Sequence, residues 1–185
     1  MKKIVTSLIA AATIATIPLH SEAATIKSGK AYVPTKNYVY KVYGQDDPNT
    51  YSKLTCKGPI SERECADKDY FGYTHAYDDN AIYFGIAGSW PGLISPVQFP
   101  MTTGKTYSYT TQNIFTGEVF IRYYKVVSTN LTKKVGKKTY KHVIKLDNLD
   151  TSYTYIAKNH GVILLNYKEN GKMKTYYKVM DYWKK

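Results

Sequence analysis

Four stretches near the C-terminus decide the fold: KKTYKHVIKL (137–146), SYTYIA (152–157), VILLNY (162–167) and KMKTYYKVMDY (172–182). Tyr, Val, Ile and Thr dominate their apolar positions, and these residue types favour strands over helices. The gaps between the stretches carry Asn or Gly, which suit tight turns. We therefore predict four consecutive antiparallel strands in this part of the chain.

The same pattern continues toward the N-terminus, where five further strands are expected, at 38–43, 70–77, 81–86, 107–111 and 118–127. In the last of these, Val119, Ile121, Tyr123 and Val127 share one face and Arg122 points to the other. Segment 88–100 holds five Gly and Pro residues and is expected to be irregular. Nine or ten short strands and no amphipathic helix predict an all-β fold, an antiparallel meander that forms a half-barrel or barrel, with a β-sandwich as the alternative.

The extreme N-terminus has the organisation of a secretory signal peptide. Lys2 and Lys3 precede an apolar run, and Ser21-Glu22-Ala23 places small residues where a signal peptidase cleaves. The run is short for a membrane span and contains Pro18, which argues against the alternative of an uncleaved anchor. We expect residues 1–23 to be the signal peptide and 24–185 a single β-rich domain that is secreted, either extracellular or associated with the cell wall.

The two cysteines, Cys56 and Cys65, lie nine positions apart in a stretch rich in turn and charged residues. In an oxidising compartment they are expected to form one local disulfide, which stabilises an exposed loop by about 2 to 3 kcal/mol. The spacing does not match a redox motif, and a structural zinc site needs four ligands, so a metal role is not expected.

The chain is strongly basic, with 26 Lys and Arg against 14 Asp and Glu and a formal net charge of +12. Only Arg63 and Arg122 are arginine, so lysine carries the charge. Lysine is a hydrated point charge without the bidentate geometry of a guanidinium, which favours diffuse electrostatic attraction. Nucleic acid is a poor partner for an exported protein. An anionic cell-wall polymer or a glycan is the expected partner, with a solubilising face as the alternative.

Twenty tyrosines exceed what one core of this size can bury with every hydroxyl satisfied. Some are therefore expected on the surface of the sheet, where their rings could contact sugars or an anionic polymer, although cross-strand packing is the plainer use. The predicted ligand-binding residues are Trp90, Tyr107, Tyr123, Tyr140 and Tyr155 for contact, and Lys137, Lys138 and Lys158 for charge.

No pattern in the chain amounts to a catalytic or metal signature. His75, His142 and His160 lie in separate predicted elements, and a metal site would need them to converge with a carboxylate. The Gly-x-Ser-x-Gly elbow of serine hydrolases is absent. We therefore expect no catalytic residues, no metal and no cofactor, and a secreted hydrolase remains the least favoured alternative.

Several short motifs resemble a recurrent β-meander of small secreted or lipid-anchored bacterial envelope proteins, most of unassigned function. They are FP (99–100), GKTY (104–107), YYKV (123–126), GKKTYKHV (136–143) and YIAKNHGV (155–162). The resemblance covers residues 97–168 and implies a half-barrel similar to that of lipoprotein carriers. It adds a second hypothesis to surface binding, namely that an apolar small molecule or lipid occupies a pocket inside the half-barrel.

Overall fold

The computed structural model describes residues 24–44, 51–67, 72–78, 80–87, 95–112 and 116–185. This part of the chain is built of strands, and its helical content is limited to two short 3₁₀ turns, η1 (Lys30–Tyr32) and η2 (Ile60–Glu62). The strands are β1 (Thr25–Ile26), β2 (Tyr38–Gly44), β3 (Ser52–Lys57), β4 (Arg63–Ala66), β5 (Gly72–Tyr77), β6 (Ala81–Ala87), β7 (Ser95–Gln98), β8 (Met101–Thr102), β9 (Thr106–Gln112), β10 (Val119–Val135), β11 (Lys138–Asp147), β12 (Ser152–Ala157), β13 (Gly161–Glu169) and β14 (Lys172–Lys184).

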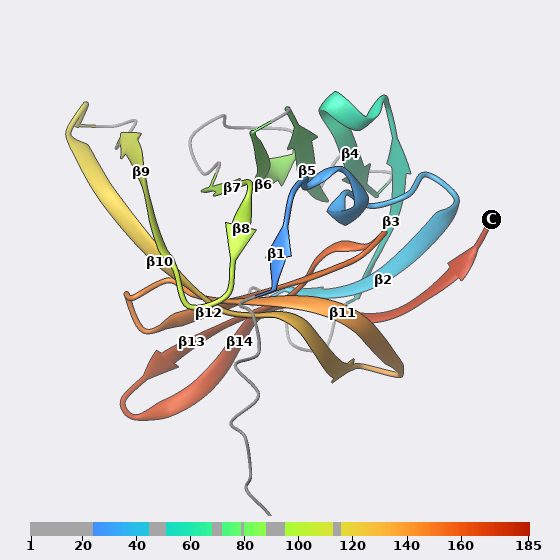
Figure 1. The fold of residues 1–185 in the computed structure, drawn as a ribbon. Coiled ribbons are helices and arrows are strands. Elements are labelled where there is room, and N and C mark those ends of the chain that lie inside the picture. Colours follow the sequence, from blue (N-terminus) through green and yellow to red (C-terminus); the bar gives the residue numbers. More distant parts are fainter. Residues whose placement is uncertain (1–23, 45–50, 68–71, 79, 88–94, 113–115) are drawn as a thin grey trace, which may run out of the picture.

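Twelve of these strands form one antiparallel sheet that curls into a nearly closed barrel (Figure 1). The order across the sheet is β7-β6-β5-β4-β3-β2-β14-β13-β12-β11-β10-β9, so neighbours in sequence are neighbours in space except where β14 pairs with β2. The predicted all-β antiparallel meander is therefore confirmed, and the sheet is a barrel rather than a sandwich. Strands β1 and β8 pair separately as a small two-stranded sheet.

The two ends of the sheet, β7 and β9, meet through side chains instead of a backbone ladder. The Gln98 backbone N–H donates to the Tyr124 hydroxyl at 2.7 Å, and Gln98 Nε2 donates to the Ser108 carbonyl at 2.8 Å. Near this seam the Tyr107 hydroxyl donates to the Pro100 carbonyl and accepts from the Thr102 N–H. Side chains therefore hold the barrel together along this one line.

Two segments that were expected to lack strands contain them. Cys56 and Cys65 form the predicted disulfide, but they face each other across the β3–β4 hairpin and are buried, so the bond joins two strands of the wall rather than an exposed loop. Within the segment expected to be irregular, residues Ser95–Gln98 form β7. Pro96 is compatible with β7 because β7 is an edge strand, where a missing backbone N–H costs no ladder bond.

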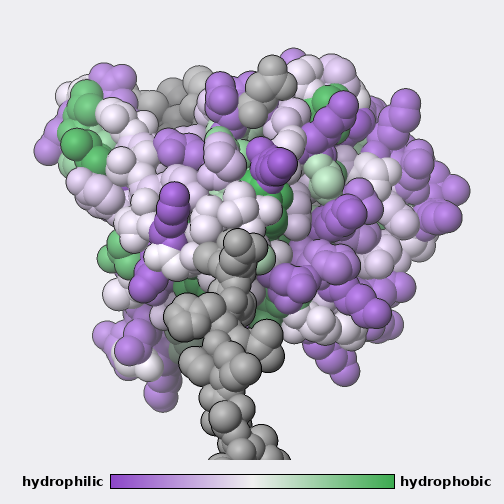
Figure 2. Space-filling view, viewed as in Figure 1, coloured by the Kyte–Doolittle hydropathy of each residue, from purple (hydrophilic) through white to green (hydrophobic). Residues whose placement is uncertain are grey.

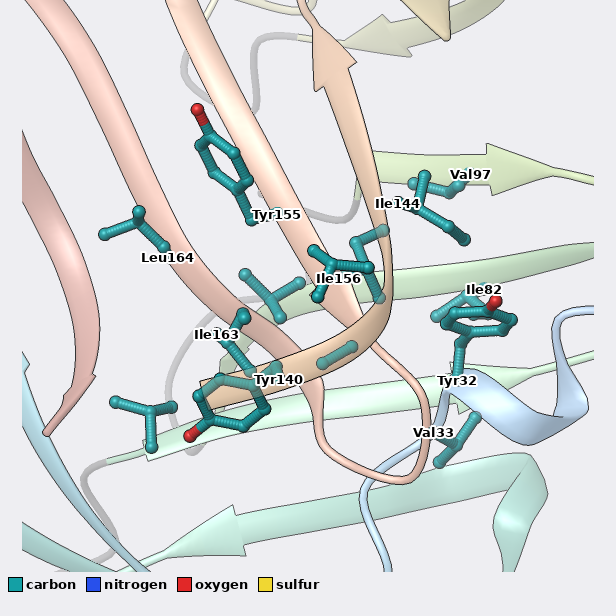
Figure 3. Packing of buried hydrophobic residues seen from close by; sticks show 14 of the residues in the cluster. Tyr32, Val33, Ile82, Val97, Tyr140, Ile144, Tyr155, Ile156, Ile163 and Leu164 are labelled. Atoms are coloured by element: carbon teal, nitrogen blue, oxygen red, sulfur yellow. The ribbon is translucent and has the colours of Figure 1, made fainter. Parts of the chain in front are cut away.

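The apolar core covers the inner face of the sheet and, on β11–β13, part of the other face, where Val143 and Ile163 are fully buried. Ile82 and Val97 pair across β6 and β7, and Ile144 and Ile156 pair across β11 and β12, with all four buried (Figure 3). Tyr32 of η1 is also buried and packs in the same cluster. The inner face of the barrel is therefore apolar over much of its length.

The outer surface is largely hydrophilic in the view of Figure 2, with a hydrophobic patch at the end of the β9–β10 hairpin, at its upper left. Val119 and Ile121 at the start of β10 are each 61% exposed. In the described part of the chain, neither helical turn has the length or apolar character to cross a membrane.

Candidate functional site

A cavity of about 610 Å³ occupies the lumen of the barrel. A volume of this size lies within the usual range for small-molecule sites, roughly 300–1,000 Å³. Its lining comes from nine strands, β5–β7 and β9–β14, or the turns that follow them, and comprises Tyr73, Ile82, Phe84, Gly85, Pro96, Val97, Tyr109, Thr111, Arg122, Tyr124, Leu146, Asn148, Asp150, Ser152, Thr154, Ile156, Val162, Leu165, Asn166, Tyr167, Glu169 and Tyr176.

The lining changes from apolar to polar along the strands. On β12 every second residue faces the lumen, and the series runs from buried Ile156 through half-buried Thr154 to half-buried Ser152. On β10 buried Tyr124 is followed, two residues toward the hairpin, by exposed Arg122. The cavity therefore has an apolar, aromatic floor and a hydrogen-bonding mouth.

One wall of the mouth is a connected polar network at the β11–β12 turn. Asn148 Nδ2 donates to Ser152 Oγ at 2.9 Å and to Thr154 Oγ1 at 3.0 Å. Ser152 Oγ in turn donates to Asp150 Oδ1 at 2.6 Å, and the Ser152 backbone N–H donates to the same oxygen. These bonds fix the four side chains, because both Asn148 amide hydrogens and the Ser152 hydroxyl hydrogen are committed.

The charges at the mouth nearly balance. Glu169 forms an ion pair with Lys174. Arg122 lies over the Phe120 ring, 5.6 Å from its centroid, and stands directly across from Tyr109 in the β9–β10 register. Among the described lining residues this leaves Arg122 and Asp150 as opposite charges, so their charges cancel in a strongly basic protein.

Beyond the floor lies a buried aromatic cluster. The Tyr177 ring centroid is 4.4 Å from that of Tyr73. Burial is the main cause that raises the pKa of the Tyr177 hydroxyl well above its usual value, and the nearby Tyr73, Tyr40 and Tyr140 add to it. His160 lies among the same rings, 5.3 Å from Tyr140, and its Nδ1 is 3.2 Å from the Tyr40 hydroxyl. The cluster gives this part of the barrel a packed aromatic core.

Three buried polar atoms have no hydrogen-bond partner in the described part of the chain: Arg63 Nε, His75 Nδ1 and the Tyr140 hydroxyl. His75 Nε2 accepts the Val162 N–H at 3.2 Å, so the neutral ring carries its proton on Nδ1. Burial lowers the pKa of His75 to about 3 and that of His160 to about 4. Both imidazoles are therefore neutral at ordinary pH.

The predicted contact tyrosines occupy different environments. Tyr123 is exposed on the outer face of β10, whereas Tyr140 is buried among Tyr182 and His160. Tyr155 is buried too, with Lys133 and Lys145 Nζ 4.9 and 5.9 Å from its ring centroid. Tyr107 stacks on Tyr124 near the seam, with centroids 5.4 Å apart. The structure does not bring these four rings onto one surface.

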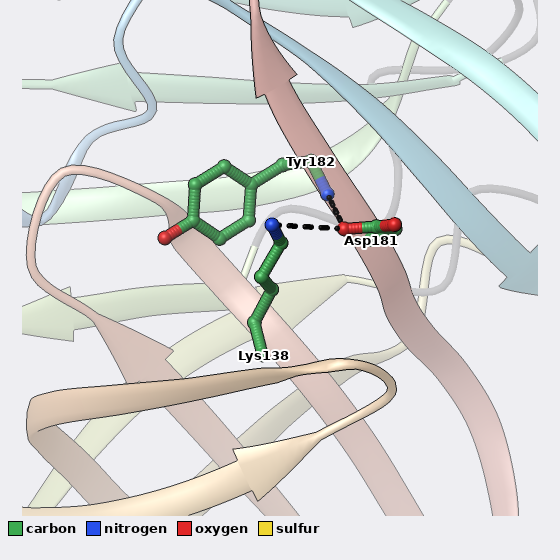
Figure 4. Close-up of polar contacts among 3 residues, drawn as sticks. All are labelled: Lys138, Asp181 and Tyr182. Atoms are coloured by element: carbon green, nitrogen blue, oxygen red, sulfur yellow. Dashed lines mark hydrogen bonds and ion pairs between the residues drawn. The ribbon is translucent and has the colours of Figure 1, made fainter.

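Of the three predicted lysines, Lys137 and Lys138 are consecutive, and Lys158 lies in another turn. Lys138 forms an ion pair with Asp181 at 3.3 Å and lies 5.0 Å from the Tyr182 ring centroid, while the Tyr182 N–H donates to the same carboxylate (Figure 4). Lys137 is adjacent in the β10–β11 turn, and Lys158 is exposed in the turn after β12. Trp90 lies outside the described residues. Among the residues described, no three His, Cys, Asp or Glu side chains gather closely enough to hold a metal ion.

No family model, curated protein or solved structure matches this chain. The candidate site is therefore identified from the structure alone, as the cavity in the lumen of the barrel. Sequence reasoning missed its residues because they are spread over nine strands, each of which contributes between one and five of them. The alternation of 152–156 and the turn residues Asn148 and Asp150 were the available signals, but the strand pairing that brings them together was not.

Proposed function

We propose that this protein is a non-catalytic binding protein that holds a small amphipathic molecule in the lumen of its barrel. The observation that carries the proposal is the graded lining of the cavity, from apolar Ile156 at the floor to Ser152 and Asn148 at the mouth. A ligand with an apolar body and a polar end would match both regions at once, and burial of its apolar surface would supply most of the affinity.

The described part of the chain offers support for this use over catalysis. The buried titratable groups near the lumen, His75 and His160, are held neutral by burial and lie among aromatic rings or backbone groups. Neither lines the cavity. The groups that do line it are suited to contact and hydrogen bonding with a bound molecule.

The test is a lumen-blocking substitution with a matched control. Thr154→Trp places an indole in the middle of the cavity, whereas Thr110→Trp places one on the outer face of β9, opposite Ile121. We expect native mass spectrometry of the parent protein to show a bound small molecule or, after delipidation, alkyl compounds to raise its melting temperature. Thr154→Trp should abolish both signals while Thr110→Trp keeps them. A parent protein that shows neither signal would refute the proposal.

A second candidate function is binding of an anionic cell-wall polymer or glycan through surface lysines. It is favoured by the excess of basic residues, since 26 Lys and Arg stand against 14 Asp and Glu. Lys133, Lys145 and the half-buried Tyr153 lie together with Tyr155 on β10–β12 and are the residues to test. A secreted location belongs to this proposal and is supported by the disulfide and by the signal-peptide pattern.

Sedimentation with purified cell walls tests this second function. Binding that falls with added salt, and that Lys133→Glu with Lys145→Glu abolishes, would support it. Salt-independent binding, or binding that survives both charge reversals, would refute it.

A further inference from the structure

We infer that the polar end of the lumen ligand is a neutral, hydroxylated group such as a sugar or polyol, rather than a carboxylate, phosphate or ammonium. This inference rests on the proposed function, because it concerns the same cavity. It follows from three properties of the mouth: its charge balance, the hydrogen-bonding groups left free on its wall, and the rigidity of that wall.

Charge balance argues against an ionic head group. The acidic lining residue Glu169 is already paired with Lys174, and Asp150 uses one oxygen to accept two bonds from Ser152. Arg122 is a single exposed guanidinium. An anion would gain Arg122 but lie in the same mouth as Asp150, and a cation would meet the reverse arrangement. Among the described lining residues, neither an anion nor a cation has a partner of opposite charge without a residue of like charge in the same mouth.

The free hydrogen-bonding groups suit a hydroxyl, which both donates and accepts. Thr154 Oγ1 accepts a hydrogen bond from Asn148 Nδ2, so the Thr154 hydroxyl hydrogen stays free to donate. Among the described residues, the side-chain oxygen of Asn148, Oδ1, stays free to accept. One wall of the mouth therefore offers a donor at Thr154 beside an acceptor at Asn148.

The wall that carries these groups is held in place before any ligand arrives. Thr151 and Leu149 both adopt positive φ, +75° and +57°, in the β11–β12 turn. The Leu149 N–H donates to Asp147 Oδ1 at 3.0 Å, and the Lys168 N–H donates to the Thr151 carbonyl at 2.8 Å, which ties the turn to β13. Preorganised polar groups bind a matching head without a further ordering cost.

Calorimetric titration with three probes that share an eight-carbon chain tests the inference: octyl β-glucoside, octanoate and octyltrimethylammonium, each below its micelle concentration. We expect the glucoside to bind at least about tenfold more tightly than either ion, because only its hydroxyls match the donors and acceptors of the mouth. Thr154→Val, which is isosteric and removes the hydroxyl, should weaken glucoside binding about fivefold and leave octanoate binding unchanged. Thr110→Val, the same change on the outer face, should alter neither.

The outcomes separate this inference from the proposed function. If octanoate or the ammonium probe binds as tightly as the glucoside, or if Thr154→Val weakens all three probes equally, the neutral head group is wrong and lumen binding stands. If the inference is right, the glucoside preference appears in the parent protein and is reduced in Thr154→Val alone. Binding of all probes that persists in Thr154→Trp would place them outside the lumen and overturn both.

Discussion

Acidification should unfold this barrel over a pH range set by two buried histidines. Burial lowers the pKa of His160 to about 4 and that of His75 to about 3, against 6.5 for the exposed side chain. As the pH falls below 6.5, the unfolded chain binds protons that the folded chain refuses, so the free energy of unfolding decreases. The loss continues until the pH reaches each folded-state pKa, and it is absent above pH 6.5.

The magnitude follows from the two shifts. Each excluded proton lowers the free energy of unfolding by about 1.4 kcal/mol per pH unit, so both together give a slope of about 3 kcal/mol per unit. Between pH 6.5 and 4 each histidine removes about 3 kcal/mol, which sums to about 6 to 7 kcal/mol. A typical domain has only about 5–15 kcal/mol in total. The barrel should therefore be close to unfolding near pH 4.

Urea unfolding followed by circular dichroism, at half-unit steps from pH 7.5 to 4, measures this slope. His160→Asn removes one of the two groups and should halve the slope, whatever it costs in absolute stability. His142→Asn is the matched control, because His142 is exposed and takes part in neither buried site, and its slope should equal that of the parent. A free energy of unfolding that stays constant from pH 6.5 to 4.5, or an unchanged slope in His160→Asn, would refute the reasoning.

Two further stability predictions concern the backbone and the disulfide. Gly161 has φ +68°, and a Cβ there would lie 2.5 Å from His75 Nε2, so Gly161→Ala should cost more than about 2 kcal/mol in chemical denaturation. Gly171→Ala, at φ +77° with no atom within 4 Å of the added carbon, should cost only about 1 kcal/mol, and equal losses would contradict the steric argument. Replacing Cys56 and Cys65 together by Ala should lower stability by about 3 kcal/mol and the melting temperature by about 6 to 12 °C, and an unchanged melting temperature would count against the bond as a constraint on the unfolded chain.

Local patterns in the sequence were sufficient to predict the regular strands. The predicted strand at 152–157 coincides with β12, and those at 38–43 and 81–86 each end one residue short of β2 and β6. These segments are rich in Tyr, Val and Ile and are bounded by turn residues, so propensity and periodicity agree.

The missed or shortened strands have identifiable causes. β3 (SKLTCK) and β4 (RECA) are short and charged, and their place in the sheet depends on pairing with each other and with β2 and β5 rather than on local preference. β10 runs to Val135, far beyond the predicted end at 127, because it bends through three register shifts between Val126 and Lys133. Each bulge changes the phase of the alternation, so a period-two pattern ends at the first one.

Which face of a strand is buried was harder to predict than the strand itself. Val119, Ile121 and Tyr123 do share a face, as predicted, but that face is exposed, and Arg122 and Tyr124 line the lumen instead. Both faces of this strand carry apolar residues, so alternation alone could not assign the inner one. The same ambiguity affects Tyr155, which is buried one position away from the lumen residue Ile156.

The basic composition of the chain and its lumen chemistry are separate properties. No lysine of the described chain lines the lumen, although lysines account for all but two of the 26 basic residues. The two arginines differ, since Arg122 reaches the mouth and Arg63 is buried in the wall. A large change in surface lysines could therefore alter solubility or attraction to a polymer and leave the cavity intact. Net charge consequently bears on what the outside of the barrel attracts, whereas the nature of a bound molecule depends on the few polar groups around Asn148 and Thr154.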